Sequence, residues 1–337
     1  MSYASSVRCL RIVLCAAVLT VLTLNGCAST ETMGGDTANP AERVALAGAE
    51  RSVKVGVLRQ PHLSHALFYD RYLPTNAKLE IVPFANSTEI KNAVVSGDLA
   101  FGVTGITAAL QGAANDEPVV VVASAADGGS AIVAKEGAGI SSVADLRGKR
   151  IGYMPGSTQD ILLRLTLRDA GLDAAEDVEL LKVQFADMPA ALARGDIDAF
   201  SGAETGPSDA LVKGGTVLVT RPYETDLGKI NIVLATSRAL ISSDPELVRA
   251  MVAVHAKATD YMRANPDVWA AEVASKYGFR DDSLKLAIEN IELRWHIDDA
   301  YLAQTAVLGQ QQLALAQIRQ EPDYSEFIDV SFVRAIG

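Results

Sequence analysis

The chain has 337 residues, of which 49% are hydrophobic and 21% are charged, as is typical of a globular protein with a substantial core. A chain of this length usually folds into roughly two domains. It carries 30 basic and 41 acidic residues, so its formal net charge is −11. Such an acidic chain is a poor partner for nucleic acid, whose phosphates are neutralised by Lys and Arg. The charge does not exclude a small anionic ligand, because a local site can oppose the global field.

The first 26 residues have the pattern of an export signal. Arg8 and Arg11 precede an apolar run from Ile12 to Leu24. This run is shorter than the roughly 20 residues that a membrane-spanning helix needs. We therefore predict a secretory signal peptide over residues 1–26. Its removal takes two of the 30 basic residues and no acid, which leaves 28 basic and 41 acidic residues and a net charge of −13.

The end of this segment, Leu24-Asn25-Gly26-Cys27, resembles the lipobox of bacterial lipoproteins. The resemblance implies a diacylglycerol on the sulfur of Cys27 and cleavage just before it. The other cysteines, Cys9 and Cys15, lie before this point, so the mature chain has no pair for an internal disulfide. The alternative is a plain cleaved signal with an incidental cysteine. We expect an extracytoplasmic, lipid-anchored protein, and the sequence does not say which membrane carries the anchor.

Residues 27–52 read as a flexible, lipidated tether, because they are rich in small and polar residues without periodicity. The folded part is expected to begin near Val53. From there, apolar β-type runs alternate with helical patterns, which predicts an α/β architecture with mainly parallel sheets. The expected strands are Val53–Leu58, Leu79–Phe84, Leu99–Thr104, Val119–Ser124, Ala131–Lys135, Arg150–Tyr153, Val178–Val183, Ala199–Ser201, Val217–Thr220 and Asn231–Thr236.

Helix boundaries are marked by capping residues, glycines and prolines. From Pro245 to about Gln317 the pattern predicts an almost continuous helical region. The boundary signals are Asn86 and Glu89 with Gly97, Asp187 with Gly195, Asp244-Pro245 and Asn265-Pro266.

Two segments about a hundred residues apart, 94–102 and 192–202, follow one plan. Each ends a helix, passes through Gly-Asp, enters an apolar strand that contains Ala-Phe, and reaches a glycine. This repetition suggests two lobes built alike. The alternative is that helix–Gly–strand junctions are simply common in α/β proteins.

The strongest local signal for a ligand is the turn Gly156-Ser157-Thr158, which joins an expected strand to an expected helix. The first amides of a helix are unsatisfied and carry a partial positive charge, so they can bind an anion without a basic side chain. Gly156 would let a ligand approach the backbone. Ordinary helix capping by Ser157 or Thr158 is the alternative, and the segment alone favours capping.

Three more junctions have a similar character. They contain Thr104-Gly105-Ile106-Thr107, Gly129-Ser130 and Glu204. Three of the four junctions follow expected strands, and ligands in open α/β sheets bind beyond the carboxyl ends of strands. The convergence favours a binding site over four independent turns.

No arrangement of residues predicts catalysis or a metal site. The sequence contains no HExxH, P-loop, GxGxxG or GxSxG motif. Apart from Cys27 the mature chain has no cysteine for thiol chemistry or metal binding. His62 and His65 follow the first expected strand and could line a cleft, whereas His255 and His296 are more often structural in helical patterns. We expect neither a cofactor nor a metal.

Three segments carry a resemblance to a known family: SGDLAFGVTGITAAL (Ser96–Leu110), ADLRGKRIGYMPGSTQDILLRLTLRDAG (Ala144–Gly171) and ADMPAALARGDIDAFSG (Ala186–Gly202). They resemble the solute-binding proteins of ABC transporters, in the branch that binds nitrate, aliphatic sulfonates and taurine. That branch also includes binders of thiamine pyrimidine precursors and riboflavin. The resemblance covers roughly Val53 to Arg294.

The resemblance implies a two-lobed clamp of the type II periplasmic-binding-protein kind, with a helical C-terminal region and a cleft between the lobes. Crossings near Asp127 and Ile232 would give a first lobe of residues 53–127 plus 233–337 and a second of residues 128–232. The residues implied to face the ligand are Gln60, His62, His65, Thr104, Gly105, Ile106, Thr107, Gly129, Ser130, Gly156, Ser157, Thr158 and Glu204.

The sequence departs from the family at pocket positions. Residues 59–65 replace a Gly-rich turn, residues 72–76 replace a Gly-Leu-Phe segment, and Ala203 stands where many members have Trp. The ligand could therefore differ from sulfonate or nitrate. The expected function is capture of a small polar or anionic solute by a monomer that delivers it to an ABC permease and its ATPase. The alternatives are a sensor that presents its ligand to a membrane receptor, and an enzyme resembling a pyrimidine synthase.

Overall fold

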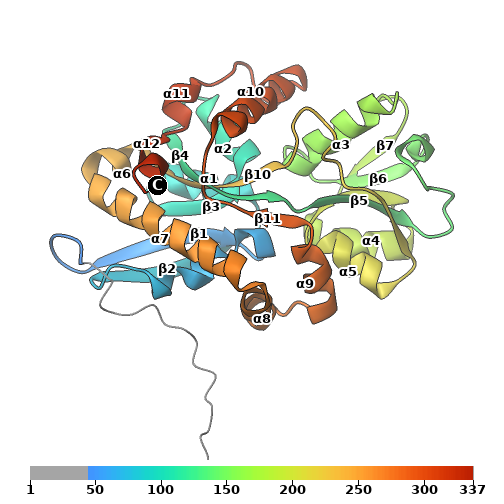
Figure 1. The fold of residues 1–337 in the computed structure, drawn as a ribbon. Coiled ribbons are helices and arrows are strands. Elements are labelled where there is room, and N and C mark those ends of the chain that lie inside the picture. The colour runs from blue at the N-terminus through green and yellow to red at the C-terminus, as the bar shows by residue number, and fades with distance from the viewer. Residues whose placement is uncertain (1–44, 337) are drawn as a thin grey trace, which may run out of the picture. The chain divides into compact units, whose positions relative to one another are not determined.

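The computed structural model describes residues 45–336. The predicted signal peptide, Cys27 and most of the predicted tether lie outside the described residues. The described chain forms two β-sheets with helices packed against them (Figure 1). Within residues 45–336, none of the helices has the length and hydropathy needed to cross a membrane.

The first sheet has six strands in the order β11-β4-β10-β3-β1-β2. Strands β2, β1 and β3 are parallel, and β10 runs antiparallel between β3 and β4. The pairing of β1 with β2 runs without a break from Arg51↔Ala77 to Leu58↔Phe84. The bounds are β1 (Arg51–Leu58), β2 (Ala77–Phe84), β3 (Phe101–Gly105), β4 (Val119–Gly128), β10 (Ile230–Ser237) and β11 (Ile291–Leu293).

The second sheet has five strands in the order β7-β6-β8-β5-β9. Strands β7, β6 and β8 are parallel, and β5 runs antiparallel between β8 and β9. The bounds are β5 (Ser130–Lys135), β6 (Arg150–Tyr153), β7 (Glu179–Lys182), β8 (Ala199–Ala203) and β9 (Thr216–Thr220).

The helices connect and cover these strands. Short 3₁₀ segments occur at Pro61–Leu63, His65–Arg71, Val143–Leu146 and Phe185–Asp187. The α-helices are α1 (Ser87–Ser96), α2 (Ile106–Ala113), α3 (Thr158–Asp169), α4 (Met188–Arg194), α5 (Gly206–Lys213), α6 (Arg238–Ser243), α7 (Pro245–Ala264), α8 (Pro266–Tyr277), α9 (Asp281–Ile288), α10 (Asp299–Ala314), α11 (Tyr324–Phe327) and α12 (Ser331–Arg334).

The α/β architecture and all ten expected strands are confirmed. Strand β11 was not expected, because Ile291–Leu293 is too short to stand out from the helical pattern around it. The sheets are mixed: most strands share a direction, but β10, β11 and β5 run against their neighbours. β4 continues directly into β5, which pairs antiparallel with β8. β10 then brings the chain back into the first sheet beside β4 and runs antiparallel to it.

The expected helix caps are confirmed in part. Asn86 accepts a hydrogen bond from the amide of Glu89, and Asp244 accepts one from the amide of Leu247. Asp187 and Asn265 occupy N-cap positions without a capping side-chain bond. The glycines expected to end α1 and α4 do so in the left-handed conformation, where a residue without Cβ is least strained.

The chain passes twice between the sheets. It leaves the first sheet after Gly128 and enters the second at Ser130, and it returns through residues 221–229. The return therefore precedes the position near Ile232 that the sequence suggested, because Ile232 already pairs with β3 and β4 inside the first sheet. Gly128 and Gly129 both have positive φ, a conformation that suits glycine.

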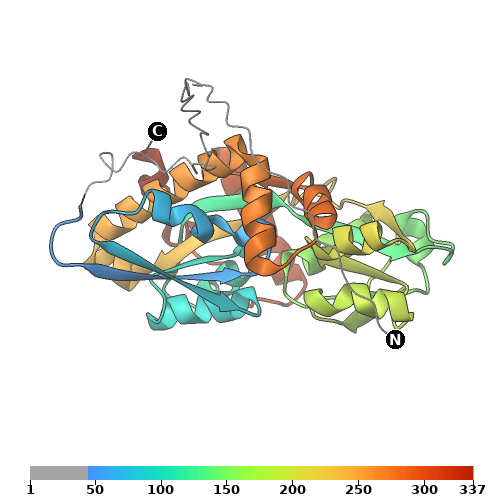
Figure 2. The ribbon, with the colours of Figure 1, turned by 90° about the horizontal axis from the view of Figure 1, so that it is seen from below.

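Helix α3 links the two cores. Its residues Leu163 and Leu167 pack in a cluster with strands of the second sheet. Ile161, Leu162 and Leu165, on its other side, belong to the large core cluster of the first sheet. In Figure 2 the strands of the first sheet and those of the second lie beside one another. Helix α9 also packs against α5, which follows β8 of the second sheet. The two sheets are thus joined by apolar packing as well as by the chain.

Candidate ligand-binding cleft

A cavity of about 500 Å³ lies where the carboxyl ends of strands from both sheets meet. Residues just after β1, β2 and β3 form one wall, and residues just after β6, β7 and β8 form the other. Loops at this edge bind ligands in open α/β sheets because helices begin there. The lining residues are Leu58, Arg59, Gln60, His62, Leu63, Phe84, Ala85, Asn86, Ser87, Thr88, Glu89, Gly105, Thr107, Ala108, Met154, Pro155, Gly156, Ser157, Thr158, Gln159, Gln184, Phe185, Ala186, Ala203, Asn231 and Ile232.

Helices α1, α2 and α3 all begin at this cavity, but only α2 begins without a capping side chain. Its N-cap is Gly105, and the first residues of the helix include Thr107 and Ala108 on the cavity wall. Uncapped amides at a helix N-terminus attract an anion or another hydrogen-bond acceptor. The start of α2 is therefore the part of the wall best suited to a ligand oxygen.

The start of α3 is already occupied by a carboxylate. Ser157 Oγ accepts a hydrogen bond from the amide of Asp160, and the Asp160 carboxylate accepts one from the amide of Gly156 at 2.9 Å. Arg164 Nε donates to the same carboxylate at 2.7 Å. The segment that gave the strongest sequence signal thus uses its amides for capping, the alternative that the sequence itself favoured.

The buried histidine of the cavity is neutral. His62 is 1% exposed, and burial lowers its pKa to about 3. Its Nδ1 has no hydrogen-bond partner. A Cβ on Gly129 would lie 3.3 Å from this nitrogen, so the glycine leaves room for the ring. At neutral pH the His62 ring beside the cavity is therefore uncharged.

Seven of the thirteen predicted site residues line the cavity: Gln60, His62, Gly105, Thr107, Gly156, Ser157 and Thr158. The other six lie behind its walls. Thr104 donates to the carbonyl oxygen of Ser87 at 3.1 Å, and Ile106 is part of the apolar core. The ring of His65 lies 4.8 Å from that of His255, also inside the core.

The remaining three, Gly129, Ser130 and Glu204, lie at the passage between the sheets. Glu204 is 2% exposed and directs its carboxylate away from the cavity, toward Asn290 and the amide of Ser208. Burial raises the pKa of this carboxyl group, while the hydrogen bonds from Asn290 and Ser208 oppose the rise. The wall position here belongs to Ala203, the preceding residue.

Several lining residues were missed by the sequence reasoning. Asn86, Ser87 and Thr88 follow β2, and Gln184 follows β7. Both strands were predicted, so the rule about carboxyl ends would have found them had it been applied to every strand. Gln159 and Asn231 had no such signal.

The two walls also touch each other. Thr107 Oγ1 lies 3.5 Å from Thr158 Oγ1, across the cavity from the start of α2 to the start of α3. Gln317, after α10, donates to the Asp160 carboxylate at 3.0 Å and accepts from Gln111 of α2 at 3.4 Å. These contacts join the two walls.

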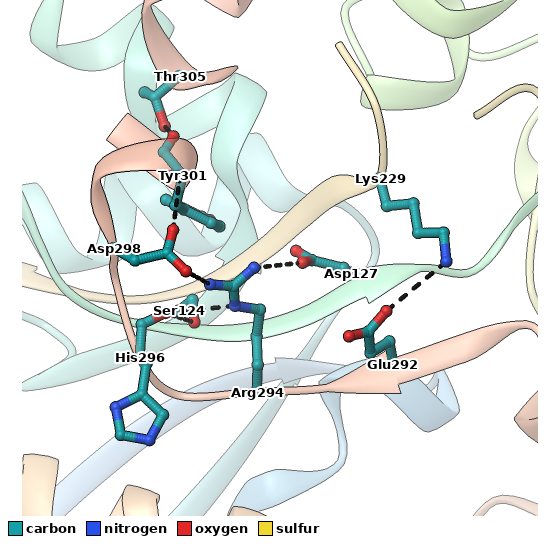
Figure 3. Close-up of polar contacts among 9 residues, drawn as sticks. All are labelled: Ser124, Asp127, Lys229, Glu292, Arg294, His296, Asp298, Tyr301 and Thr305. Atoms are coloured by element: carbon teal, nitrogen blue, oxygen red, sulfur yellow. Dashed lines mark hydrogen bonds and ion pairs between the residues drawn. The ribbon is translucent and has the colours of Figure 1, made fainter. Parts of the chain in front are cut away.

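Ion pairs lie beside the first passage between the sheets, where β4 leads into β5 (Figure 3). Arg294, just after β11, donates to Asp127 of β4 at 2.8 Å and to Asp298 at 3.2 Å. Lys229 and Glu292 form a second ion pair beside it, at 3.6 Å. Burial raises the pKa of Asp127, and Arg294 counters this effect. These ion pairs fix β11 against the end of β4.

The comparison with family models identifies the class of protein. Residues 74–268, more than half of the chain, match the model described as NMT1/THI5 like. The chain belongs to this family.

Individual relatives agree with this assignment. The chain is 28% identical over 222 residues to a binding protein of Brucella abortus strain 2308, covering 63% of each chain. It is 27% identical over 217 residues to an aliphatic sulfonates-binding protein of Escherichia coli K12, covering 64% of this chain and 66% of the relative. The matches thus span just under two thirds of these curated relatives.

The fold is shared with solved structures. The alkanesulfonate-binding protein SsuA from Xanthomonas axonopodis pv. citri, bound to MOPS, superimposes with a TM-score of 0.74 at 18% identity. The superposition covers 85% of this chain and 100% of that one. The periplasmic-binding-protein fold expected from the sequence is thereby confirmed.

Proposed function

We propose that the protein captures a small solute outside the cytoplasm and delivers it to an ABC importer. The observation that carries this proposal is the cavity where the carboxyl ends of strands from two separate sheets converge. A ligand that touches both walls favours the closed arrangement in proportion to its extra affinity for that state. Clamps of this kind close by a hinge motion between two lobes.

The ligand class that the cavity suits best is a small polar or anionic organic molecule. The uncapped start of α2 suits one oxygen-rich group. Arg59, at the rim, is the one basic side chain among the lining residues, so a highly charged anion has little to pair with. Phe84 and Phe185 add apolar surface for a carbon skeleton. A sulfonate, carboxylate, nitrate-like ion or heterocycle fits this description, and the relative from E. coli is named for aliphatic sulfonates.

We place the two lobes at the two sheets. The boundary near Ile232 that the sequence suggests moves to residues 221–229, so residues 53–127 plus 230–337 would form the first lobe and residues 130–220 the second, with the hinge at Gly128-Gly129 and in residues 221–229. The positive φ of both glycines and the separation of the strands into two sheets support this division. Packing of α9 on α5 indicates that part of the C-terminal region moves with the second lobe.

The location and partners follow from the same proposal. A signal peptide over residues 1–26, a lipid on Cys27 and a tether to residue 52 would hold a monomeric clamp near the membrane. Tethering raises the effective concentration of the clamp at a permease and its ATPase. A sensor that presents its ligand to another membrane receptor would use the same clamp, and neighbouring transport genes would favour the importer.

An enzyme on the same fold is the second candidate, because a fold alone does not separate binding from catalysis. Within residues 45–336, no group of three or more His, Cys, Asp or Glu residues could hold a metal ion. The neutral, buried His62 and the turned-away Glu204 do not form an acid–base pair at the cavity. These observations support binding without turnover.

A thermal-shift screen tests the proposal. The probes are ethanesulfonate, taurine, nitrate, benzoate and a 4-aminopyrimidine, each with the purified protein. A probe at 100 times its dissociation constant should add about 2.7 kcal/mol to the free energy of unfolding. Mass spectrometry of the recovered probe should show it unchanged. Absence of a shift with every probe, or conversion of the probe, would argue against the proposal.

A further inference from the structure

Asn290, between α9 and β11, is buried beside the first passage between the sheets and does not line the cavity. Both N–H groups and the oxygen of its side-chain amide have hydrogen-bond partners. Nδ2 donates to the carbonyl oxygen of Ser130 and to Oε1 of Glu204, both at 3.0 Å. Oδ1 accepts from the hydroxyl of Tyr223 at 2.9 Å. Its backbone carbonyl accepts from the amide of Gly129 at 2.8 Å.

Three partners of Asn290, namely Gly129, Ser130 and Glu204, stand directly behind the cavity wall. Ser130 Oγ accepts a hydrogen bond at 3.0 Å from Nε2 of Gln159, which lines the cavity. Glu204 follows the lining residue Ala203. A Cβ on Gly129 would contact His62, another lining residue. Asn290 therefore supports the wall at three places, two through its side-chain amide and one through its backbone carbonyl.

The orientation of the Asn290 amide is set by its surroundings. A backbone carbonyl and a carboxyl oxygen both need a donor, so Nδ2 must face Ser130 and Glu204. Tyr223 accepts a hydrogen bond from the amide of Ser130 at 2.8 Å, and its one proton has two acceptors in reach, Oδ1 of Asn290 at 2.9 Å and the carbonyl oxygen of Ser130 at 3.0 Å. Because every member has a partner, loss of one leaves buried groups unsatisfied.

The segment that carries Asn290 is held on both sides. Before it, Ser283 of α9 donates to Asp209 of α5 at 3.2 Å. After it, Glu292 and Arg294 of the β11 region pair with Lys229 and Asp127 (Figure 3). These contacts on both sides hold the backbone around Asn290 in place.

We infer that Asn290 is a positioning residue of the ligand site, which through Ser130 fixes the side chain of Gln159 at the cavity wall. This inference rests on the proposed function, because it assigns Gln159 to ligand contact. Gln159 is 4% exposed and its side-chain amide is held at Nε2, so the orientation of this amide toward the ligand depends on where Ser130 lies. Displacement of Ser130 should weaken binding without touching any lining residue.

The test compares four variants with the wild type. Asn290→Ala removes the support, and Tyr223→Phe, the fallback if the first variant does not fold, removes the hydroxyl that contacts both Asn290 and Ser130. The double variant Glu204→Gln, Asn290→Asp restores a hydrogen bond between positions 204 and 290 but not the Nδ2 donor to Ser130, whose carbonyl oxygen then keeps only the Tyr223 hydroxyl. Thr259→Val is the matched control, because it removes a buried hydrogen bond to the carbonyl oxygen of His255 in α7, away from Gln159.

Two readouts are needed. The first is the side-chain amide signal of Gln159 in ¹⁵N-labelled, ligand-free protein, assigned with a Gln159→Glu variant. The second is the dissociation constant for ethanesulfonate by calorimetry. Asn290→Ala should shift the Gln159 signal and raise the dissociation constant about tenfold, which corresponds to one lost hydrogen bond. Thr259→Val should change neither, and the double variant should recover thermal stability alone.

An unchanged Gln159 signal in both Asn290→Ala and Tyr223→Phe would overturn the inference. Full recovery of both readouts in the double variant would also overturn it, because Asn290 would then serve only Glu204. If wild-type protein binds no probe, the proposed function fails, while the ligand-free Gln159 signal still decides whether Asn290 positions this side chain.

Discussion

Three buried histidines should make the protein sensitive to acid. His62, His65 and His255 are each at most 1% exposed. Burial lowers the pKa of His62 to about 3 and that of His255 to about 4, and it lowers the pKa of His65, which also faces His255. The Nε2 of His255 donates to the carbonyl oxygen of Ser124, so its Nδ1 accepts from the hydroxyl of Tyr69. This arrangement requires a neutral ring.

The sign of the effect follows from proton binding. Below pH 6.5 the unfolded chain binds a proton at each histidine, whereas the folded chain does not until the lowered pKa is reached. The free energy of unfolding therefore falls as the pH falls, by about 1.4 kcal/mol per pH unit for each histidine. Between pH 7 and 4.5 this amounts to about 2–3 kcal/mol each for His62 and His255. Together they would consume a large share of a total stability of about 5–15 kcal/mol.

Two carboxyl groups act in the opposite direction. Burial raises the pKa of Asp127 and of Glu204, so the folded chain keeps these protons at a pH where the unfolded chain has lost them. Their contribution to stability grows as the pH falls. The wild-type curve alone therefore mixes both effects, and a variant that lacks one histidine is needed.

The assay is urea unfolding followed by circular dichroism, at intervals from pH 7 to 4.5. In His255→Gln the side-chain amide offers a donor for Ser124 and an acceptor for Tyr69, but it cannot titrate. This variant should lose about 2–3 kcal/mol less than wild type over the pH range, whatever its stability at pH 7. Parallel curves for wild type and variant would refute the reasoning.

Four further variants test other parts of the structure. Gly102→Ala should cost about 1–3 kcal/mol in urea unfolding, because its Cβ would lie 2.4 Å from the Cγ2 of Ile90; an unchanged midpoint would contradict the packing. Arg294→Ala should cost about 3–5 kcal/mol by leaving the buried Asp127 unpaired, and a loss below 1 kcal/mol would show that the pair matters little. Asn86→Ala should cost about 1 kcal/mol through loss of the α1 cap, measured in the same assay. Cys27→Ser should move the protein from the membrane to the soluble fraction of its cells, and retention on the membrane would contradict the proposed lipid.

The sequence predicted the central strands of the sheets well because β3, β4, β5, β8 and β10 are buried on both faces. Strand β4 is buried along its whole length and appears in the sequence as an unbroken apolar run at its start. The sequence did not predict where β4 ends, because the strand continues from Ala125 to Gly128 through small residues that carry no β signal. Strand β11 has three residues, and only its pairing with β4 makes it a strand.

The candidate site was harder to predict, because position along a strand does not say which way a side chain points. Glu204 and Ala203 are neighbours, yet Ala203 lines the cavity and Glu204 faces Asn290. Asn290 is distant in sequence from its partners Ser130 and Glu204 and follows a helix without any motif. Local sequence patterns contain no information about such long-range hydrogen bonds, so this part of the site required the structure.

The central claim, that a solute binds in the cavity between the two sheets, is tested most directly by calorimetric titration of three proteins with the probe that shifts the melting temperature most. The three proteins are wild type, Thr88→Trp and Asn92→Trp. In Thr88→Trp the new side chain fills the rim of the cavity from the first turn of α1. Asn92→Trp is the matched control, because position 92 lies one turn further along the same helix and does not line the cavity. We expect one site in wild type and in Asn92→Trp, and at least tenfold weaker binding in Thr88→Trp. Binding of equal strength in all three proteins, or in none, would contradict it.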